Sequence, residues 1–363
     1  MPYILSTSHI QLPYLFAQEK LMEFSREIFG STFKDIDRLL RAFKNGQVDT
    51  RYFIKDLDWF KQDHTFEERN NAFIEGAVTY GTKAIQSCLS NATFLKQEVA
   101  LQEIEAIFFV TSSGIATPTI DARIMNILPF SPHTKRIPLW GLGCAGGASG
   151  LSRAFEYCKA FPEAKVLVLS VELCSLSFQR NDRSKSNLIG SSLFSDGAAC
   201  TLICGDDVAR KKISQVKRVP KILSTQSTLM PDSLDVMGWD VKNEGLHVIF
   251  SKDIPTIISN WLSPNVDVFL EKNDMNQQDI RHFIAHPGGK KVIDAYCESL
   301  GFHEEMVKIS MEVLREHGNM SSATILYVLE KFMEQDISEG EYGLAAALGP
   351  GFSSELLLMR WEE

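Results

Sequence analysis

The sequence predicts an α/β protein with two halves of domain size. Its 363 residues, 44% of them apolar, provide enough material for a large core. From residue 104 onward, short apolar runs alternate with helical patterns, which is typical of strands interleaved with helices. One arrangement, an apolar strand that runs into a polar turn, occurs at 104–114 and again at 280–289. The two segments share the order of their elements and not their residues, but this similarity favours a duplicated architecture.

The first 95 residues are predicted to be helical. Apolar residues recur at a roughly helical period at Leu15, Met22, Phe24 and Phe29. Thr65 and Glu68 have the spacing of a capping box, which predicts a helix that continues over 72–89.

Buried strands are predicted from residue 104. The run 104–110 is rich in Ile and Phe and ends at a polar loop, 111–114. Similar runs lie at 137–140, 165–171 and 198–203.

The pattern weakens after 205–207, so we divide the chain into an N-terminal half, 1–206, and a C-terminal half, 207–363. The second half is predicted to contain a helix over 255–270, a strand over 280–285 and a helix over 290–300.

Composition excludes several classes of function. The net charge of -9 argues against nucleic-acid binding, which needs clustered Lys and Arg. No apolar run approaches the ~20 residues that span a bilayer, and the start of the chain lacks a basic leader segment. The seven cysteines are an odd number without CxxC pairs, which favours reduced thiols. We therefore expect a cytoplasmic protein without an integral membrane segment.

Cys144 is the candidate nucleophile. It lies in a glycine-rich turn, 141–150, between a predicted strand and a predicted helix over 151–158. Backbone N–H groups and the helix dipole at such a turn favour a thiolate, and the glycines would leave room for a bulky acyl substrate. An isolated cysteine is more often a small buried hydrophobe, but the glycine-rich turn favours a reactive thiol here.

The same turn matches G-x-G-x-x-G at Gly141, Gly143 and Gly146, the pattern of a dinucleotide-binding loop. That loop follows the first strand of its domain, whereas more than a hundred residues, including an earlier strand, precede this turn. We therefore do not interpret it as a dinucleotide site.

His286 and Asn319 are the candidate partners of Cys144. His286 ends a buried strand at the turn 286–289, and clefts form at the ends of such strands. Asn319 lies in a turn, 317–323, ahead of a helix over 323–333, where it could equally be a simple helix cap. His317 is the alternative histidine, but it lies in the approach to a helix. A Cys, a His and an Asn can together form a thiolate and stabilise an oxyanion.

These residues resemble the type III polyketide synthases, the chalcone- and stilbene-synthase-like branch of the thiolase superfamily. The resemblance runs nearly end to end. Its most specific segments are Thr111–Gly114, the Cys144 turn, Val171–Phe178, Leu193–Ala199, Ala285–Gly289, Gly318–Ser322 and Leu348–Phe352. Their number and order, more than any single segment, identify the family.

The resemblance implies a five-layered αβαβα thiolase fold built from two similar halves, and a homodimer. It implies that Cys144, His286 and Asn319 form a catalytic triad and that Phe194 is a gatekeeper between a CoA tunnel and a reaction cavity. Further residues are implied to line or shape that cavity: Ser112, Thr117, Cys174, Ser177, Val248, Ser321, Gly349, Pro350 and Gly351. Among these, Thr117 would reach into the partner's cavity.

Three basic residues, Arg38, Arg41 and Lys44, match positions that hold the CoA phosphates in the family. The departures concern the substrate. Val248 stands where plant members carry a second gatekeeper phenylalanine, and Cys174, Ser177 and Ser321 occupy positions that vary within the family. The short chain is similar to bacterial members that extend fatty acyl-CoA starters to alkylpyrones.

The implied activity is repeated decarboxylative condensation of malonyl-CoA onto an acyl-CoA starter, with no metal and no redox cofactor. One alternative is an enzyme of the ketoacyl synthase III type that initiates fatty-acid synthesis. The loop 349–351 and the string 319–322 favour the polyketide branch. A second alternative is an inactive, acyl-CoA-binding partner subunit, whose expected mark is loss of a triad residue. All three triad residues are present.

Overall fold

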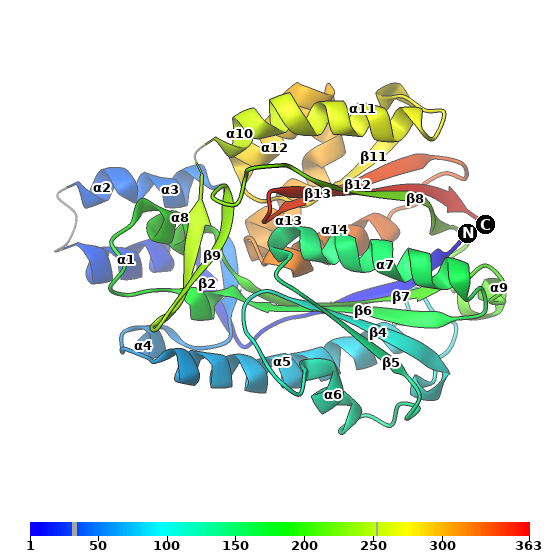
Figure 1. Cartoon of the computed structure of the whole chain (residues 1–363), viewed down its shortest axis with the longest axis horizontal. Helices are drawn as coiled ribbons and strands as arrows, with labels where there is room; N and C mark the ends of the chain where they lie inside the picture. The colour runs from blue at the N-terminus through cyan, green and yellow to red at the C-terminus, as the bar shows by residue number, and fades with distance from the viewer. Residues whose placement is uncertain (31–34, 252) are drawn as a thin grey trace.

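A computed structural model describes residues 1–30, 35–251 and 253–363 of the chain. Its main sheet contains nine strands in the order β11 (Ile280–Ala285), β12 (Tyr342–Gly349), β13 (Ser353–Glu362), β8 (Val219–Leu229), β1 (Tyr3–Ile10), β7 (Asp196–Cys204), β6 (Lys165–Leu173), β4 (Ile104–Thr111) and β5 (Lys135–Trp140). β1 and β8 are joined by a single residue pair, Tyr3 with Lys221. The sheet therefore consists of a four-stranded and a five-stranded part, which Figure 1 shows as separate layers.

Helices cover both outer faces and fill the space between the two parts of the sheet (Figure 1). The five-stranded part is covered by α5 (Phe66–Leu89) and α6 (Ile120–Met125). The central layer contains α7 (Gly146–Ala160) and α14 (Thr324–Met333), beside α13 (Lys308–His317). The remaining outer layer contains α10 (Ile254–Ile257), a π-helical turn (Ile258–Leu262), α11 (Ser263–Glu271) and α12 (Lys290–Leu300). These are the five layers that the resemblance implies.

A side lobe stands at one end of the layers, on the left in Figure 1. It contains β2 (Tyr14–Ala17), α1 (Gln18–Phe29), α2 (Ile36–Leu39), α3 (Arg41–Asn45), β3 (Thr50–Phe53), α4 (Leu57–Phe60), α8 (Lys185–Leu193), β9 (Met237–Lys242) and β10 (Gly245–Phe250). Its core is a cluster of phenylalanines from α1, α3, β2, β3 and α4. Short elements complete the chain: α9 (Arg210–Ile213) and the 3-10 turns η1 (Leu101–Glu103), η2 (Gly143–Ala145), η3 (Cys174–Ser177), η5 (Gln277–Asp279), η6 (Glu304–Val307) and η7 (Ser321–Ala323).

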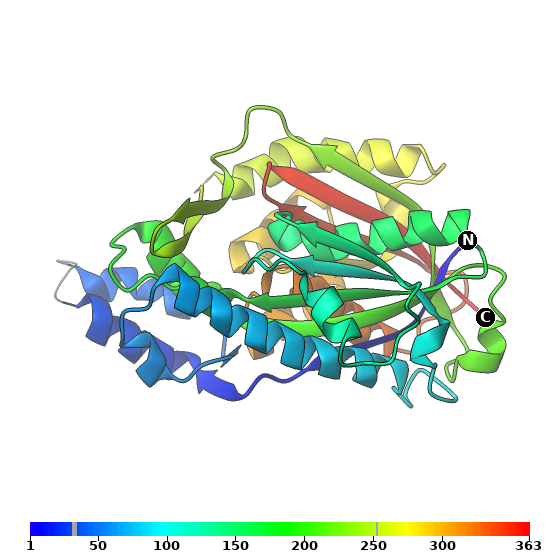
Figure 2. The same ribbon diagram turned by 60° about the horizontal axis from the view of Figure 1, so that its bottom comes forward.

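The two halves repeat one order of elements. β1, α5, β4, α7, β6 and β7 of the first half correspond to β8, α11, β11, α14, β12 and β13 of the second. Figure 2 shows α5 lying along the outer face of the first half. The first turn of α5 carries the predicted capping box, in which Thr65 and Glu68 bond each other's backbone N–H groups. The predicted α/β class is confirmed, while a division after residue 206, in the connection between β7 and β8, remains a prediction.

The helical prediction for the first 95 residues is wrong where β1, β2 and β3 form. β1 was not predicted because it carries polar side chains that face the interior. These side chains form hydrogen bonds there. Ser6 donates to the Cys88 carbonyl at 2.7 Å, and the hydroxyls of Thr7 and Thr201 lie 2.8 Å apart. Leu15, assigned to a helical period, lies in β2. The strands β8, β9 and β10 were likewise not predicted after residue 207. β8 carries Ser, Thr, Gln and Lys on its partly exposed positions, and β9 carries Asp and Lys.

Among the described residues, no helix combines the length and apolar character needed to cross a bilayer.

Candidate active site

Cys144 lies in η2, the single turn between the end of β5 and the start of α7, as the sequence predicts. The glycines of this turn serve a purpose that differs from the predicted one. Gly143 has a φ of +48°, and a Cβ there would lie 2.6 Å from Cδ of Pro350. A side chain would therefore be both strained and blocked. The glycine makes room for another part of the chain rather than for a substrate.

Gly147, in the first turn of α7, allows a second close approach. A Cβ at this position would lie 2.1 Å from the carbonyl oxygen of Ser322 in η7. The Cys144 turn of the first half is thus in direct backbone contact with the Asn319–Ser322 turn of the second half. This contact brings together two segments that are about half a chain apart in sequence.

His286 directly follows β11, and its backbone N–H continues the sheet by donating to the Ala346 carbonyl at 2.9 Å. The side chain is 2% exposed, and neither ring nitrogen has a hydrogen-bond partner among the described residues. Burial lowers the pKa of His286 to about 3, because the interior disfavours the charged imidazolium. The neutral ring has one N–H donor and one acceptor nitrogen available.

Asn319 is held by bonds on both sides of its amide. Its Oδ1 accepts the backbone N–H of Ser321 at 2.8 Å, and its Nδ2 donates to the Gly288 carbonyl at 3.1 Å. The first bond closes a local turn, whereas the N-cap positions of η7 and α14 are Met320 and Ala323, so Asn319 is not the helix cap that was considered as an alternative. The second uses one of two N–H hydrogens, so a further donor remains on Nδ2.

The Cys144 thiol lies 4.0 Å from Oδ1 of Asn319 and is 6% exposed. Burial raises the pKa of Cys144 to about 12, and the contacts of the thiol with Ser321 and Asn319 oppose that change only in part. The sequence argument predicts a stabilised thiolate, whereas burial here favours the neutral thiol. Burial therefore favours the uncharged form of each side chain, Cys144 and His286.

One cavity of about 720 Å³ contacts all three residues, Cys144, His286 and Asn319. Five cations also line it: Arg38, Arg41, Lys185, Lys290 and Lys291. We call these five residues the basic group. Arg38 pairs with Asp35, and Lys290 with Asp294, while Arg41, Lys185 and Lys291 form no ion pair within the described part of the chain. These three cations are free to bind an anionic ligand.

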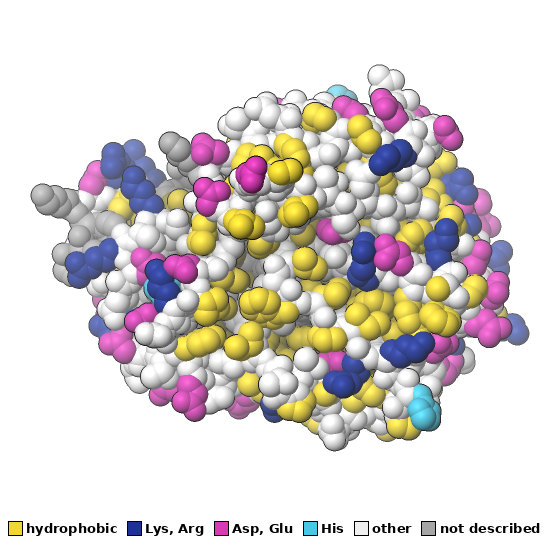
Figure 3. All heavy atoms as spheres, in the orientation of Figure 1, with side chains coloured by type: hydrophobic (Ala, Val, Ile, Leu, Met, Phe, Trp, Pro, Cys, Tyr) yellow, Lys and Arg dark blue, Asp and Glu magenta, His cyan; other side chains and the backbone are white. Residues whose placement is uncertain are grey.

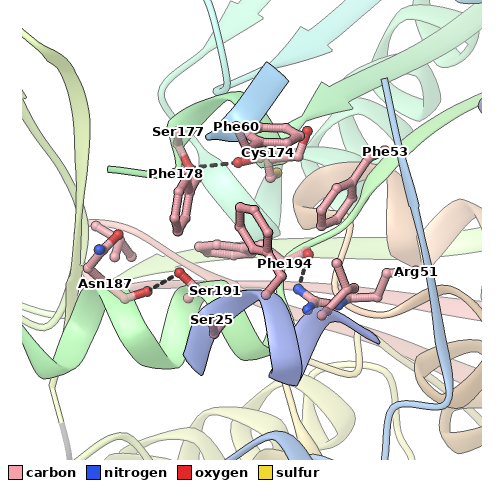
Figure 4. A pocket seen from close by; sticks show the side chains of 15 residues that line it. Ser25, Arg51, Phe53, Phe60, Cys174, Ser177, Phe178, Asn187, Ser191 and Phe194 are labelled. Carbon is pink, nitrogen blue, oxygen red and sulfur yellow. Dashed lines mark hydrogen bonds between the residues drawn. The ribbon is translucent and has the colours of Figure 1, made fainter. Parts of the chain in front are cut away.

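A second, smaller cavity of about 40 Å³ lies in the side lobe, where four of the predicted cavity residues line it: Cys174, Ser177, Phe194 and Val248. Figure 4 shows the aromatic rings of Phe53, Phe60, Phe178 and Phe194 around this space. Phe194 is placed between the two cavities, since its ring centroid lies 5.5 Å from that of Phe250, which lines the larger one.

The other predicted cavity residues line neither of these two cavities. Ser112 accepts the backbone N–H of Gly143 at 2.8 Å, so it supports the Cys144 turn. Gly349 and Pro350 pack against the same turn, and Gly351 follows them at a φ of +133°. Ser321 bonds to the Cys144 thiol. Thus the loop 349–351 holds the nucleophile in place.

Two predicted residues lie further out. Thr117 is exposed on the loop before α6, and Lys44 is exposed in α3 but does not line the large cavity. His317, the alternative histidine, packs edge-on and face-on against Tyr327, His9 and Tyr52 instead of lining that cavity. This placement supports the choice of His286.

Sequence reasoning missed several residues that the fold brings to the site. The buried carboxylate of Glu172 accepts bonds from the Ser112 backbone, the Ser113 hydroxyl and the Ser322 hydroxyl, and so links the loops that support Cys144 and Asn319. Three lysines of the basic group were not predicted: Lys185, Lys290 and Lys291. Tyr296, which lines the same large cavity, was not predicted either. A cluster of basic positions in the sequence could have indicated the lysines, but nothing in the sequence distinguishes Glu172 or Tyr296. Metal-binding clusters of three or more His, Cys, Asp or Glu side chains are absent from the described residues.

Comparison with known proteins shows which family this chain resembles. The N-terminal domain of chalcone and stilbene synthases matches residues 59–207, and the C-terminal domain matches 221–361. A "putative chalcone synthase" of Bacillus subtilis is 54% identical over the full length of both chains. The 1,3,6,8-tetrahydroxynaphthalene synthase of Streptomyces peucetius is 31% identical, covering 96% of this chain and 90% of that protein.

Solved structures agree. The crystal structure of 1,3,6,8-tetrahydroxynaphthalene synthase from Streptomyces coelicolor, described as a bacterial type III polyketide synthase, has a TM-score of 0.91 at 27% identity and covers 99% of each chain. The type III domain of Steely1 from Dictyostelium has a TM-score of 0.90 at 24% identity, which supports the fold alone. Both family domains match this chain in order, and relatives that are 54% and 31% identical match it over nearly their whole length. The chain therefore belongs to the chalcone and stilbene synthase family, the type III polyketide synthases.

Proposed function

We propose that the chain extends a fatty acyl-CoA starter by repeated decarboxylative condensation with malonyl-CoA and releases an alkylpyrone. The observation that carries the proposal is the single cavity that contacts Cys144, His286 and Asn319 at one part and the basic group at another. Within one cavity, a CoA thioester could place its phosphates at the cations and its thioester at the thiol. Carboxylate and phosphate groups are the ligands that Arg and Lys hold best.

In the loading step, the Cys144 sulfur attacks the thioester carbonyl of the starter. The thiol proton passes to His286 and then to the departing CoA sulfur, so the products are acyl-Cys144 and free CoA. Transfer of the acyl group from the CoA sulfur to the Cys144 sulfur needs no oxidant and no metal. His286 lines the same cavity as Cys144, and in this step it accepts the thiol proton while the sulfur attacks.

In the extension step, malonyl-CoA loses carbon dioxide, and the electron pair of the broken carbon–carbon bond forms a thioester enolate. The His286 ring N–H and the remaining Nδ2–H of Asn319 would stabilise the enolate oxygen. The enolate carbon then attacks the acyl-Cys144 carbonyl, Cys144 departs as a thiolate, and the extended chain stays on CoA. After two rounds, attack of an enol oxygen on the thioester would close a pyrone and release CoA. The proposal includes no metal and no redox cofactor.

The apolar lining of the small cavity, rather than its volume, supports a long, flexible starter. Its lining is mainly apolar, and Val248 provides less bulk than an aromatic residue would. A space of about 40 Å³ does not hold a fatty chain, so the surrounding phenylalanine rings must move aside to admit one. Each buried methylene contributes about 0.8 kcal/mol, so a chain six carbons longer could gain several kcal/mol of selectivity.

The test is kcat/KM for hexanoyl-, dodecanoyl- and coumaroyl-CoA, with products identified by mass. We expect dodecanoyl-CoA to be preferred, and Val248→Phe to move the preference toward hexanoyl-CoA. Val241→Phe is a matched control, since Val241 is 58% exposed on the same hairpin. Preference for coumaroyl-CoA, or equal shifts in both variants, would contradict a fatty starter. An acyl-enzyme that forms without any extension would favour the inactive partner subunit.

We also propose a homodimer formed through the β5 edge. β5 ends the sheet, and three large side chains near it are about half exposed: Ile115, Ile127 and Trp140. Figure 3 shows hydrophobic side chains gathered on this face. Asp121 of α6 is fully buried, yet neither carboxylate oxygen has a hydrogen-bond donor among the described residues, and Arg136 lies 3.9 Å away. A second copy could cover the apolar side chains.

Light scattering should give twice the mass of the 363-residue chain, and Trp140→Glu should reduce it to one chain. A parent protein that remains monomeric at assay concentrations would contradict the dimer. If Thr117 reaches into the partner's cavity, Thr117→Trp should shift the starter preference toward shorter chains. The seven free cysteines suit the reducing cytoplasm, which we keep as the proposed location.

A further inference from the structure

Tyr296 is a polar residue of the large cavity that the mechanism above does not use. It lies in α12, and its side chain is completely buried. The ring packs edge-on against Phe283 of β11, with centroids 5.4 Å apart at 88°. It lines the same cavity as Cys144, His286 and Leu348. Its position is therefore fixed by the core, while part of it faces the reacting groups.

The Tyr296 hydroxyl has no hydrogen-bond partner among the described residues. A buried hydroxyl without a partner destabilises a folded protein, and a phenylalanine would fill the same space without that cost. By contrast, the hydroxyl of another buried tyrosine, Tyr327, donates to the Ile10 carbonyl and accepts the Ala198 N–H, both at 3.3 Å. An unpaired donor beside an active-site thiol is the arrangement expected of a group whose partner is the substrate.

We propose that the Tyr296 hydroxyl donates a hydrogen bond to the carbonyl oxygen of the acyl group on Cys144 and stabilises the negative charge that forms there during condensation. The proposal rests on the proposed function, since it requires an acyl-Cys144 intermediate. When the enolate carbon attacks, the carbonyl oxygen gains an electron pair, and a fixed neutral donor lowers the energy of that state. The pair returns to re-form the carbonyl as Cys144 departs, so Tyr296 neither gains nor loses a proton.

Burial raises the pKa of Tyr296, so the phenol remains a neutral donor. Two arguments favour the acyl carbonyl over the malonyl carboxylate as its partner. A donor on the malonyl carboxylate would also stabilise the ground state and slow the loss of carbon dioxide. His286 and Asn319 already supply donors for the enolate, which leaves the acyl oxygen as the group that lacks a side-chain donor.

The test compares Tyr296→Phe with the parent in three separate reactions: acyl transfer from dodecanoyl-CoA, measured by intact mass; release of carbon dioxide from malonyl-CoA without a starter; and single-turnover condensation of preloaded acyl-enzyme. We expect condensation to slow by about 10²- to 10³-fold, as for loss of one oxyanion donor. Carbon dioxide release should stay within about twofold. The thermal midpoint of Tyr296→Phe should equal or exceed that of the parent, because no bond is lost.

Tyr327→Phe is the matched control, which should lower the thermal midpoint while condensing at the parent rate per folded molecule. Unchanged condensation in Tyr296→Phe would overturn the inference and make the hydroxyl a tolerated core group. A parallel fall in carbon dioxide release would overturn it in favour of contact with malonyl-CoA. If the parent itself forms no acyl-enzyme, the proposed function fails instead, so the two failures are distinguishable.

Discussion

The side-chain nitrogen of Asn319 donates a hydrogen bond to the carbonyl oxygen of Gly288 at 3.1 Å. This bond joins the turn after β11, which carries His286, to the turn before α14, which carries Asn319. The distance between the two proposed donors is thereby fixed by the protein itself. A fixed pair of donors stabilises a developing anion without reorganisation at the moment of reaction.

Replacing Asn319 should separate the two half-reactions. In Asn319→Ala, carbon dioxide release from malonyl-CoA should fall by about 10²- to 10³-fold, because the enolate oxygen loses one of two donors. Loading of Cys144 from a starter should fall much less. Rates of carbon dioxide release and of acyl-enzyme formation measure the two steps. Equal damage to both would show that Asn319 acts only as a cap of its turn.

Gly147→Ala should reduce activity by displacing the Asn319 turn. The added Cβ would lie 2.1 Å from the Ser322 carbonyl oxygen, so backbone must shift at the contact between the two halves. We expect kcat to fall at least about 10-fold per folded molecule, in line with the sensitivity of catalysis to ~1 Å misplacement.

Gly150→Ala is the matched control on the same helix. Its Cβ would meet side chains of the sheet, Val168 at 2.8 Å and Val110 at 3.0 Å, and not the Asn319 turn. This variant should lose stability but retain more activity per folded molecule, as measured by kcat together with circular dichroism. The reverse order of activities would contradict the argument.

Acid should destabilise the protein partly through His286. Its pKa is lowered to about 3 in the folded chain, below the ordinary value near 6.5, so the unfolded chain binds more protons between these two values. Stability is therefore fully present above about pH 6.5 and is lost as the pH falls toward 3. From pH 7 to pH 5 the loss from this residue is about 2 kcal/mol.

His286→Gln should remove that part of the acid sensitivity, as measured by urea unfolding at pH 7 and pH 5. His317, whose pKa burial lowers to about 4, should contribute separately. The double variant His286→Gln with His317→Gln should therefore lose more of the acid sensitivity than either single variant. An acid dependence identical to the parent in His286→Gln would show that the residue is not buried neutral.

Much of the site could be predicted from the sequence because it lies at the ends of apolar strands. The run 280–285 is entirely strand, as predicted, so His286 had to emerge at an edge of the sheet. Cys144 likewise follows β5. The strands that escaped prediction, such as β1, carry buried Ser and Thr whose partners come from distant segments.

The parts of the site that depend on contacts between the halves could not be read from sequence. Gly143 was expected to make room for a substrate, but its space is needed by Pro350. The prediction of a thiolate at Cys144 did not take burial into account, because the sequence does not show how deeply a residue is buried. Apart from Thr117, which is exposed on the loop before α6, the predicted cavity residues divide between the small cavity and the supports of the Cys144 turn, because loops from both halves surround a single nucleophile.

Intact-protein mass after incubation with dodecanoyl-CoA tests the central claim most directly. The account predicts that the parent gains one acyl group, that peptide mapping places it on Cys144, and that Cys144→Ala gains none. Cys174→Ala is the control, since Cys174 is a buried cysteine on the neighbouring small cavity and should not prevent loading. Acylation that persists in Cys144→Ala, or maps to another cysteine in the parent, would contradict the assignment of Cys144 as the nucleophile.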